Sequence, residues 1–480
     1  MSHPADLGVV EAAALMARRS LSASELVEAC LARIAERDGA HSFDGDPGSA
    51  NAWVRLYEED ARAAAARADE RRSVEAVRRD GPAPTLCGIP LGLKDLYAVA
   101  GKPLTASSRV LEETPECDCD VWARLSAAGM VLLGHLHTHE FALGGTTDQV
   151  GSPWALDRSA GGSSGGSAAA LAARMIPAAT GTDTAGSLRI PSALCGTSTI
   201  KPTRGLVSLA GVVPLGTTLD HAGPMARTLD DCAVLLAAMA GPDAGYASSA
   251  LARSLPTGAP APRGGAKPLE GLRLAVSPRV GSVTLDPDVA DGFDAALDLC
   301  RRLGAAIVGP SPPLAPLDLG DDFLVVILVE LLAYHRRFAD RRDRYRPFMQ
   351  DWFEEGDRRA VSAEAYVAAQ MRRRDLTAVW ADWFAAERIF AVVEPTVPVV
   401  APLRGPGYER AWRDAALISL THYWDWTGFP VVALPAGVGS CSGLPVGVSL
   451  VGPAGADWEL LSAGSELQAE LGVPVPPAFA

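Results

Sequence analysis

Apolar positions recur at helical spacing in the first part of the chain. Ser22 and Glu25 have the spacing of a capping box, and the apolar repeat that follows comprises Leu26, Val27, Cys30, Leu31 and Ile34. A second stretch, Asp60 to Arg79, is rich in Ala, Arg and Glu and predicts an exposed helix. Between them, Gly39 to Gly48 has the composition of a surface loop. We therefore expect residues 1–80 to form an N-terminal helical segment.

The pattern changes after this segment. From Leu86 to Leu236, short apolar runs alternate with Gly-rich turns and helical stretches, which indicates strands and helices in succession. Residues 241–267 are rich in Pro, Gly and Ala without periodicity and predict a linker-like loop, whereas residues 321–387 predict a helical insertion. A further helix is expected at Asp291–Leu303, and further strands at Leu272–Val276, Ala305–Val308, Ile389–Glu394, Val431–Leu434 and Val446–Val451. This succession of helices and strands predicts a fold of the α/β class.

Charge and composition narrow the classes of function. The 480 residues include 43 Lys and Arg against 57 Asp and Glu, a formal net charge of −14. This argues against wholesale binding of nucleic acid or of an anionic membrane. The N-terminus lacks the pattern of a signal peptide, and the most apolar helix-length run, Phe323 to Tyr334, contains Glu330 and is too short to span a bilayer. We expect a cytoplasmic protein whose scattered cysteines are free thiols.

Three short segments combine small residues with side chains that can carry chemistry. GGSSGGSAAA (161–170) lacks the lysine of a phosphate loop and the preceding strand of a dinucleotide site, so it is best interpreted as a rigid turn presenting serine hydroxyls. GTDTAGSLRIP (181–191) places small residues before Ser187, so consecutive N–H groups can converge as in an oxyanion hole. GIPLGLKDLYAVAG (88–101) surrounds Lys94 with leucines, and burial there would lower its pKa.

Histidines offer two rival mechanisms. His221 beside Asp220 is the best pair for a Ser-His-Asp mechanism, although sequence neighbours rarely face the same group. His135, His137 and His139 alternate as residues on one face of a strand do, which leaves a metal site open. Because no companion ligand is evident, we favour packing or pocket lining for these three histidines.

In this order, the three segments resemble those of the amidase-signature family. The resemblance runs from about Leu21 to Leu471 and is strongest over Gly88 to Arg227. Further matching motifs are KPTRGLVS (201–208), LDHAGPMAR (219–227), EPTVP (394–398), TGFPVVALPAG (427–437) and GLPVGVSLVG (443–452). The resemblance implies an α/β fold over residues 81–480, with a large mixed β-sheet surrounded by α-helices.

The resemblance also assigns roles in catalysis. By motif position, Ser187 is the nucleophile, Ser163 is the bridging serine on a cis peptide, and Lys94 is the base. The backbone N–H groups of Thr184, Ala185, Gly186 and Ser187 form the oxyanion hole. For Lys94 to act as a base near neutral pH, its pKa must fall by about 3 from about 10.4, a differential cost of about 4 kcal/mol. No metal or cofactor is required.

We therefore expect an amidase that hydrolyses a small-molecule carboxamide through an acyl-enzyme. The family leaves open an amidotransferase A-type subunit, which delivers ammonia within a multi-subunit complex, and a carbamate or urea-type hydrolase. A binding protein on the same fold would need a broken relay. A homodimer is compatible with this expectation.

The sequence departs from the family pattern in four places, of which those at 134–137 and 424–428 affect the expected substrate more than the chemistry. Ala160 stands where the family usually has Pro before GGSSGG, and the methyl of Ala185 is small enough to leave the oxyanion hole intact. Ala185 replaces a frequent Gly, and Gly134-His135-Leu136-His137 replaces a frequent Gly-Lys-Thr-Asn. Where the family often has Phe-Asn, this chain has Trp424-Asp425, followed by Trp426. Aromatic residues there offer flat apolar area, so Trp424 and Trp426 are candidate substrate-binding residues for an aryl or bulky apolar amide.

Overall fold

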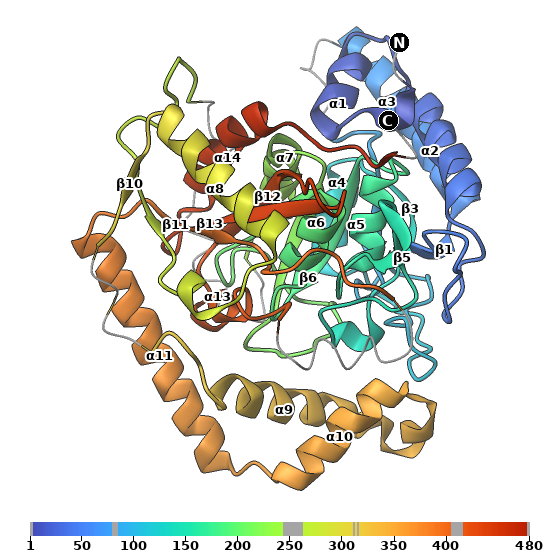
Figure 1. Ribbon diagram of the computed structural model, residues 1–480. Helices are drawn as coiled ribbons and strands as arrows, with labels where there is room; N and C mark the ends of the chain where they lie inside the picture. The colour runs from blue at the N-terminus through green and yellow to red at the C-terminus, as the bar shows by residue number, and fades with distance from the viewer. Residues whose placement is uncertain are drawn as a thin grey trace.

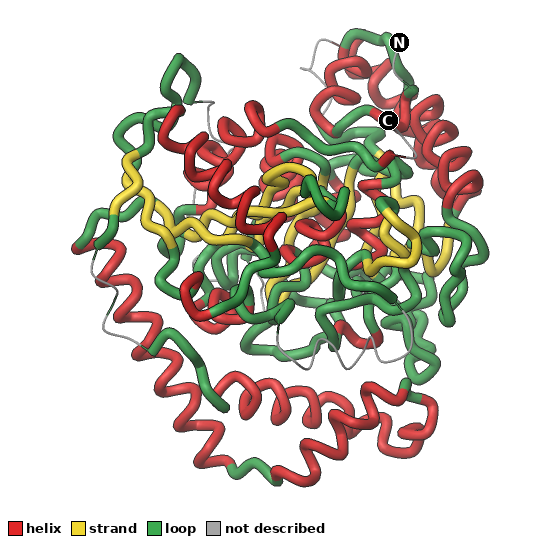
Figure 2. The backbone as a smooth tube through the Cα atoms, in the orientation of Figure 1, coloured by secondary structure: helices red, strands yellow, loops and turns green. Residues whose placement is uncertain are grey.

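A computed structural model describes residues 3–78, 85–242, 263–310, 313, 316–404 and 416–477 of the chain. It shows a large sheet through the middle of the molecule with helices packed around it (Figures 1 and 2). The expected fold, a mixed sheet surrounded by helices, is confirmed.

Among the described residues, eleven strands form one sheet in the order β1-β3-β2-β6-β8-β7-β12-β13-β11-β9-β10. Their bounds are β1 Trp53–Leu56, β2 Pro90–Lys94, β3 Val131–Leu136, β6 Ala178–Asp183, β7 Ser198–Lys201, β8 His221–Ala226, β9 Arg273–Val276, β10 Ala306–Val308, β11 Ala391–Pro395, β12 Val431–Val438 and β13 Pro445–Val451. The groups β3-β2-β6 and β11-β9-β10 are parallel, and the remaining pairs are antiparallel. A separate pair joins β4 (Gly151–Ser152) to β5 (Ala155–Ser159).

The helices that pack on this sheet come from the whole length of the chain. They include α1 Val9–Ala17, α2 Ala23–Arg37, α3 Glu58–Arg78, α4 Asp120–Ala127, α5 Gly165–Ala172, α6 Arg189–Cys195, α7 Leu229–Met239, α8 Pro287–Arg302, α13 His422–Thr427 and α14 Asp457–Leu471. Short 3-10 helices are η1 Pro4–Asp6, η2 Glu140–Ala142 and η4 Val280–Ser282. None of the helices in the described ranges is long and apolar enough to cross a membrane.

The N-terminal segment is helical except for one strand that the sequence pattern does not reveal. The capping box of α2 is present, with Ser22 and Glu25 each bonded to the backbone of the other. Strand β1 pairs antiparallel with β3 and thus forms an edge of the sheet. A four-residue strand is too short to show periodicity, which explains why the pattern predicts only helices here.

Residues 322–386 form a helical arm outside the sheet. The arm comprises α9 Asp322–His335, η5 Arg336–Arg344, α10 Pro347–Arg359 and α11 Ala363–Ala386. Figure 1 shows α9, α10 and α11, drawn in orange tones, extending away from the sheet along one side of the molecule. Most of the loop expected at 241–267 lies outside the described residues, which end at 242 and begin again at 263.

Candidate active site

Two neighbouring parallel strands bring the first catalytic candidates together at their carboxyl ends. Lys94 is the last residue of β2, and Thr182 is the penultimate residue of β6, which pairs parallel with β2. Ser163 lies just before α5, and Ser187 lies just before α6. The carboxyl ends of parallel strands are where α/β proteins commonly place their ligands. Sequence positions about 90 residues apart therefore meet at one place.

The ammonium position of Lys94 is surrounded by hydroxyl groups. Its Nζ lies 2.8 Å from Ser163 Oγ, 2.9 Å from Ser164 Oγ and 2.8 Å from Thr182 Oγ1. The side chain is fully buried. The hydroxyl of Ser164 also donates to the Thr182 carbonyl, at 3.3 Å. Lys94 thus has hydrogen-bond partners, but none of these partners carries a charge.

Burial lowers the pKa of Lys94 from its ordinary value to about 7. Desolvation is the largest cause, because a buried ammonium loses its hydration without gaining a carboxylate in contact. The more distant carboxylates of Asp183 and Asp220 act in the opposite direction and limit the fall. Near neutral pH, a substantial fraction of Lys94 is therefore an uncharged amine.

The backbone around Ser163 is held from two sides. The peptide between Gly162 and Ser163 is cis. The N–H of His139 and the hydroxyl of Thr147 donate to the Ser163 carbonyl at 3.0 Å and 3.1 Å. The N–H of Ser164 donates to the carbonyl of Ser187 at 3.3 Å, so the two serine segments are directly joined.

The loop that carries Ser187 is organised by the carboxylate of Asp183. Asp183 accepts from the N–H groups of Gly186, at 2.5 Å, and Leu188, at 3.1 Å. Two guanidinium nitrogens of Arg189 donate to the same carboxylate, at 2.9 Å and 3.0 Å. Burial alone would raise the pKa of Asp183, but Arg189 more than offsets this and holds it below its ordinary value. One of the expected oxyanion-hole donors, the Gly186 N–H, is therefore used inside the protein.

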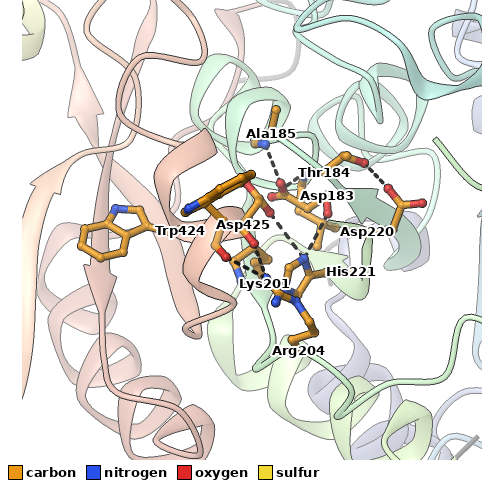
Figure 3. Close-up of polar contacts among 12 residues, drawn as sticks. Asp183, Thr184, Ala185, Lys201, Arg204, Asp220, His221, Trp424 and Asp425 are labelled. Carbon is orange, nitrogen blue, oxygen red and sulfur yellow. Dashed lines mark hydrogen bonds and ion pairs between the residues drawn. The ribbon is translucent and has the colours of Figure 1, made fainter. Parts of the chain in front are cut away.

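A buried charged cluster lies behind this loop (Figure 3). Arg189 also donates to Asp425, at 2.6 Å, and to the Thr421 carbonyl, at 3.0 Å. His221 Nδ1 lies 3.4 Å from Asp425 and 3.3 Å from the Asp183 carbonyl. The pKa of Asp425 is raised well above its usual range, chiefly by desolvation and then by the negative charge of Asp183. One arginine thus joins two buried carboxyl groups whose pKa values are shifted in opposite directions.

Asp220 and His221, the rival catalytic pair, face different groups. Asp220 accepts from the hydroxyl of Thr184, at 2.5 Å, and from the N–H groups of Leu215 and Gly216. His221 faces Asp183 and Asp425, as Figure 3 shows. The two side chains thus have no common partner among these contacts and support the loop that holds Ser187.

The three alternating histidines have separate neighbours. His135 lies on β3 and bonds to the Tyr57 hydroxyl at 2.8 Å and the Tyr97 carbonyl at 3.0 Å. His137 Nδ1 lies 3.1 Å from Ser107 Oγ. His139 Nε2 lies 3.3 Å from a carboxylate oxygen of Asp148. Only His135 is on the strand, so the shared face expected from alternation does not extend over all three residues.

A cavity of about 880 Å³ opens beside Ser187. Thr184, Ala185 and Ser187 line it on the side of the sheet. The helical arm supplies much of the opposite wall, with Phe323, Leu324 and Ile327 from α9 and Asp351, Trp352, Glu354, Glu355 and Arg358 from α10. The remaining lining includes Ile190, Leu215, Arg279, Leu317, Asp318, Ile418, Ser419 and His422.

Both arginines of the cavity wall are engaged by the protein. Arg279 donates to the carbonyls of Leu317, Ser419 and Leu420 and stacks over the Tyr423 ring. Arg358 makes a forked contact with Glu355 at 2.6 to 2.9 Å. Arg279 is thus held by the protein, whereas the side chain of Arg358 is 68% exposed and pairs with Glu355 of its own helix.

Trp424 and Trp426 belong to the packed interior and are not among the residues that line this cavity. The Trp424 ring packs against Trp380 at 5.1 Å, and its Nε1 donates to Glu394 at 2.5 Å. Trp426 packs near Phe323 at 6.3 Å and beneath the guanidinium of Arg373. The aromatic groups that line the cavity are instead Phe323, Trp352 and His422.

Several residues that shape the site carry no signal in the linear pattern. Thr182 and Asp183 lie within the motif GTDTAGSLRIP, but the motif does not indicate their contacts with Lys94 and Arg189. In the sequence, the cavity wall of α9 resembles any apolar helix. Asp425 and Arg189 are 236 residues apart, and their ion pair requires the folded sheet.

Known proteins resemble this chain in sequence and in fold. Residues 25–461 match the family model described as Amidase. The chain is 35% identical to the A-type subunit of the glutamyl-tRNA(Gln) amidotransferase from Anaeromyxobacter sp. (strain K), over 99% of this chain and 100% of that protein. It resembles the solved peptide amidase from Stenotrophomonas maltophilia with 27% identity, 98% coverage of both chains and a TM-score of 0.79.

A third similarity is to a 6-aminohexanoate cyclic dimer hydrolase, with 26% identity, a TM-score of 0.82, and coverage of 98% of this chain and 99% of that one. Together with the family match, which spans most of the sequence, these similarities complete the assignment. This chain belongs to the amidase, or amidase-signature, family of enzymes that act on amide bonds.

Proposed function

We propose that this amidase hydrolyses an uncharged, bulky apolar carboxamide through an acyl-enzyme on Ser187, with Ser163 and Lys94 as the proton relay. The observation that carries the relay is the buried Lys94 amine, whose Nζ is 2.8 Å from Ser163 Oγ and whose pKa is lowered to about 7. A lysine in this state can accept a proton at neutral pH, which an exposed lysine cannot do.

The hydroxyl partners of Lys94 suit an uncharged amine. Such an amine has two N–H donors and one lone pair. The Ser164 hydroxyl gives its hydrogen to the Thr182 carbonyl, so Ser164 Oγ accepts from Lys94. If Thr182 Oγ1 accepts the second N–H, the lone pair is left for the hydroxyl of Ser163. Ser163 can then take the proton of Ser187 as it passes its own to Lys94.

The tetrahedral oxyanion would be held by backbone N–H groups that line the cavity. Because the Gly186 N–H already donates to Asp183, we assign this role to the N–H groups of Thr184, Ala185 and Ser187. Each donor aimed at the developing charge is worth about 3 kcal/mol in the transition state. Ser163 would next return the proton to the leaving amine, and water would repeat the cycle on the acyl-enzyme.

The cavity wall supports an uncharged apolar substrate. Phe323, Leu324 and Ile327 offer an apolar surface, and aromatic contact adds about 1 kcal/mol beyond burial. A glutamine, the ammonia donor expected of an amidotransferase, carries a carboxylate that needs a cation. Of the described arginines of the wall, Arg279 is buried against three backbone carbonyls, and Arg358, whose side chain is 68% exposed, pairs with Glu355. This favours a hydrolase over the amidotransferase reading, although relatives of this chain include amidotransferase subunits.

The test is an assay of the purified chain alone. It should hydrolyse phenylacetamide without tRNA or a partner protein, and with at least tenfold higher kcat/KM than acetamide or glutamine. Ser187→Ala should abolish turnover while the melting temperature stays unchanged. Activity limited to glutamine, or appearing only with added partner proteins, would instead identify an amidotransferase; near-normal rates in Ser187→Ala would remove Ser187 as nucleophile.

A further inference from the structure

His422 places a polar group in the wall of the cavity that the relay does not use. It is the first residue of α13 and lines the cavity together with Ser187. The preceding residue, Thr421, donates through its hydroxyl to the carbonyl of Ala185, at 2.5 Å, so this helix start is tied to the nucleophile loop. The ring packs edge to face with Phe323, with centroids 5.2 Å apart. The imidazole therefore borders the space that a substrate would fill.

The hydrogen bonds of His422 define which of its nitrogens is a donor. Nδ1 lies 2.6 Å from the carbonyl oxygen of Ile418. A carbonyl can only accept, so Nδ1 carries the hydrogen. Desolvation, followed by the positive charge of Arg279, lowers the pKa of His422 to about 4, so the ring is neutral near pH 7. In a neutral imidazole that is protonated at Nδ1, Nε2 bears a lone pair and acts as an acceptor.

This acceptor belongs to a partly exposed residue of the cavity wall. Nε2 of His422 has no hydrogen-bond partner in the described part of the chain. It is also not one of the side-chain atoms that are both unpaired and fully buried. Nε2 of His137 and Nε2 of His335, by contrast, are sealed in the interior without a partner among the described residues. The neighbouring wall at His422 combines the apolar Phe323 and Ile418 with the charged Arg279 and Asp318. An acceptor in such a wall discriminates between ligands with and without a matching donor.

We propose that Nε2 of His422 accepts a hydrogen bond from an N–H or O–H group of the substrate and so selects, among bulky apolar carboxamides, those that carry such a donor. This inference rests on the proposed function in one respect, namely that the substrate occupies the cavity beside Ser187. The expected class is an aryl carboxamide with a hydroxyl on its ring. A substrate without the donor would leave Nε2 unpaired when it excludes water from this wall.

A structural role is the competing explanation, and two substitutions separate it from recognition. In His422→Asn, the side-chain amide can still donate to the Ile418 carbonyl, as Nδ1 does, but nothing replaces Nε2. In His422→Gln, the amide reaches the position of Nε2 and offers an acceptor there, while the bond to Ile418 is lost. Recognition requires that Gln retains selectivity better than Asn, and a role through Ile418 alone requires the opposite order.

The experiment compares phenylacetamide with its 2-, 3- and 4-hydroxy derivatives. Wild-type enzyme should favour at least one hydroxy isomer by about fivefold in kcat/KM, the value of one neutral hydrogen bond. His422→Asn should abolish this preference, measured as the ratio of the two kcat/KM values within the same variant, and His422→Gln should keep part of it. No preference for any isomer in wild type, or a preference that survives in Asn and disappears in Gln, would overturn the proposal.

Equilibrium binding to Ser187→Ala protein gives a readout that does not depend on turnover. The same isomer should bind about fivefold more tightly than phenylacetamide, and the added His422→Asn substitution should remove the difference. Selective binding without hydrolysis by wild type would contradict the proposed function and leave the role of His422 standing. Hydrolysis without such selectivity would support the proposed function and contradict the role of His422. Failure of every compound to bind would also overturn the role of His422.

Discussion

Lys94 must satisfy two conditions at once, since a base has to be uncharged and yet held in place by polar groups. The structure meets both conditions with three hydroxyl partners between 2.8 and 2.9 Å and no carboxylate in contact among the described residues. A carboxylate at the same distance would stabilise the ammonium form and raise the pKa. The identity of these three neighbours therefore decides whether the lysine can work near neutral pH.

The pH dependence of turnover follows from this environment. Since Lys94 is the base only when uncharged, kcat/KM should be low below pH 6, rise with a midpoint near the pKa of about 7, and level off above it. Lys94→Arg should lose at least a thousandfold in rate, because a guanidinium stays protonated. A pH-rate profile from pH 5 to 9 measures the midpoint.

A control is needed because burial also lowers the pKa of Lys201 to about 7. Lys201 Nζ lies 3.3 Å from the Pro202 carbonyl, whereas the relay serine Ser163 bonds to Lys94. The midpoint should therefore remain in Lys201→Met. Lys94 is not the titrating base if the midpoint of the profile moves by more than one pH unit in Lys201→Met and stays unchanged in Lys94 variants that retain activity.

Asp183 and Asp425 form a matched pair around Arg189, and we expect different costs of replacing them. Asp183 is held ionised and bonds to Gly186, Leu188 and Arg189, so Asp183→Asn should reduce the free energy of unfolding by about 3–5 kcal/mol. The pKa of Asp425 is raised, so its ionised form is less favoured than that of Asp183, and Asp425→Asn should cost less, about 1 kcal/mol. Urea unfolding at pH 7 measures both, and equal losses would show that the two carboxyls share one charge state.

Residue roles could be predicted where a local motif carries them. The motifs name Ser163, Ser187 and Lys94, and the structure brings Lys94 and Ser163 into contact, while their catalytic roles stay predictions. Contacts across the sheet, such as Arg189 with Asp425, could not be predicted because 236 residues separate the partners. The tryptophans at 424 and 426 illustrate the same limit, because hydrophobicity alone does not distinguish a core residue from a pocket residue.

At the scale of elements, the chemistry and the cavity wall come from different parts of the chain. The relay residues lie on β2, before α5 and before α6, whereas α9 and α10 supply the opposite wall of the cavity. The helical pattern of 321–387 predicts these helices, and α9 to α11 fall within it. Which side of α9 faces Ser187 could not be predicted, because that helix is apolar on most sides.

Substitution on the helical arm should therefore change preference without affecting the relay. Phe323→Ala should lower kcat/KM for phenylacetamide about tenfold and leave acetamide within twofold, because only the larger substrate reaches this ring. Phe353, on α10, packs against His335 and Tyr345 away from the lining residues and is the matched control. Phe353→Ala should lower the melting temperature without changing the ratio of the two rates. Equal loss on both substrates in Phe323→Ala would contradict this division.

At the scale of the whole molecule, the N-terminal segment is part of the main sheet. The sequence predicts residues 1–80 as a helical unit, but β1 pairs along β3, with Trp53 opposite Leu136, and Trp53 is fully buried. The strand forms an edge, and its removal would expose the backbone of β3. The expected homodimer and cytoplasmic location stay predictions.

Deletion of residues 1–57 should thus yield protein that aggregates on expression, because β3 would become an uncovered apolar edge. Size-exclusion chromatography of the truncated chain measures the result. Deletion of residues 1–3 is the control; it leaves the buried residues Ala5 and Leu7, α2 and β1 in place and should give soluble protein. A soluble, active chain that begins at residue 58 would show that β1 is dispensable.

The Lys94 site and the helical arm are separate parts of the chain, and this separation affects how the substrate specificity of such an enzyme can change. The wall residues Phe323, Leu324 and Ile327 come from α9, whereas the Lys94 amine bonds to Ser163, Ser164 and Thr182. Mutations on the arm can accumulate while bond cleavage continues, so new amides become accessible by small steps through active intermediates. A combinatorial library confined to those three wall positions should accordingly be rich in working catalysts with redistributed specificities, which makes α9 the natural starting point for directed evolution.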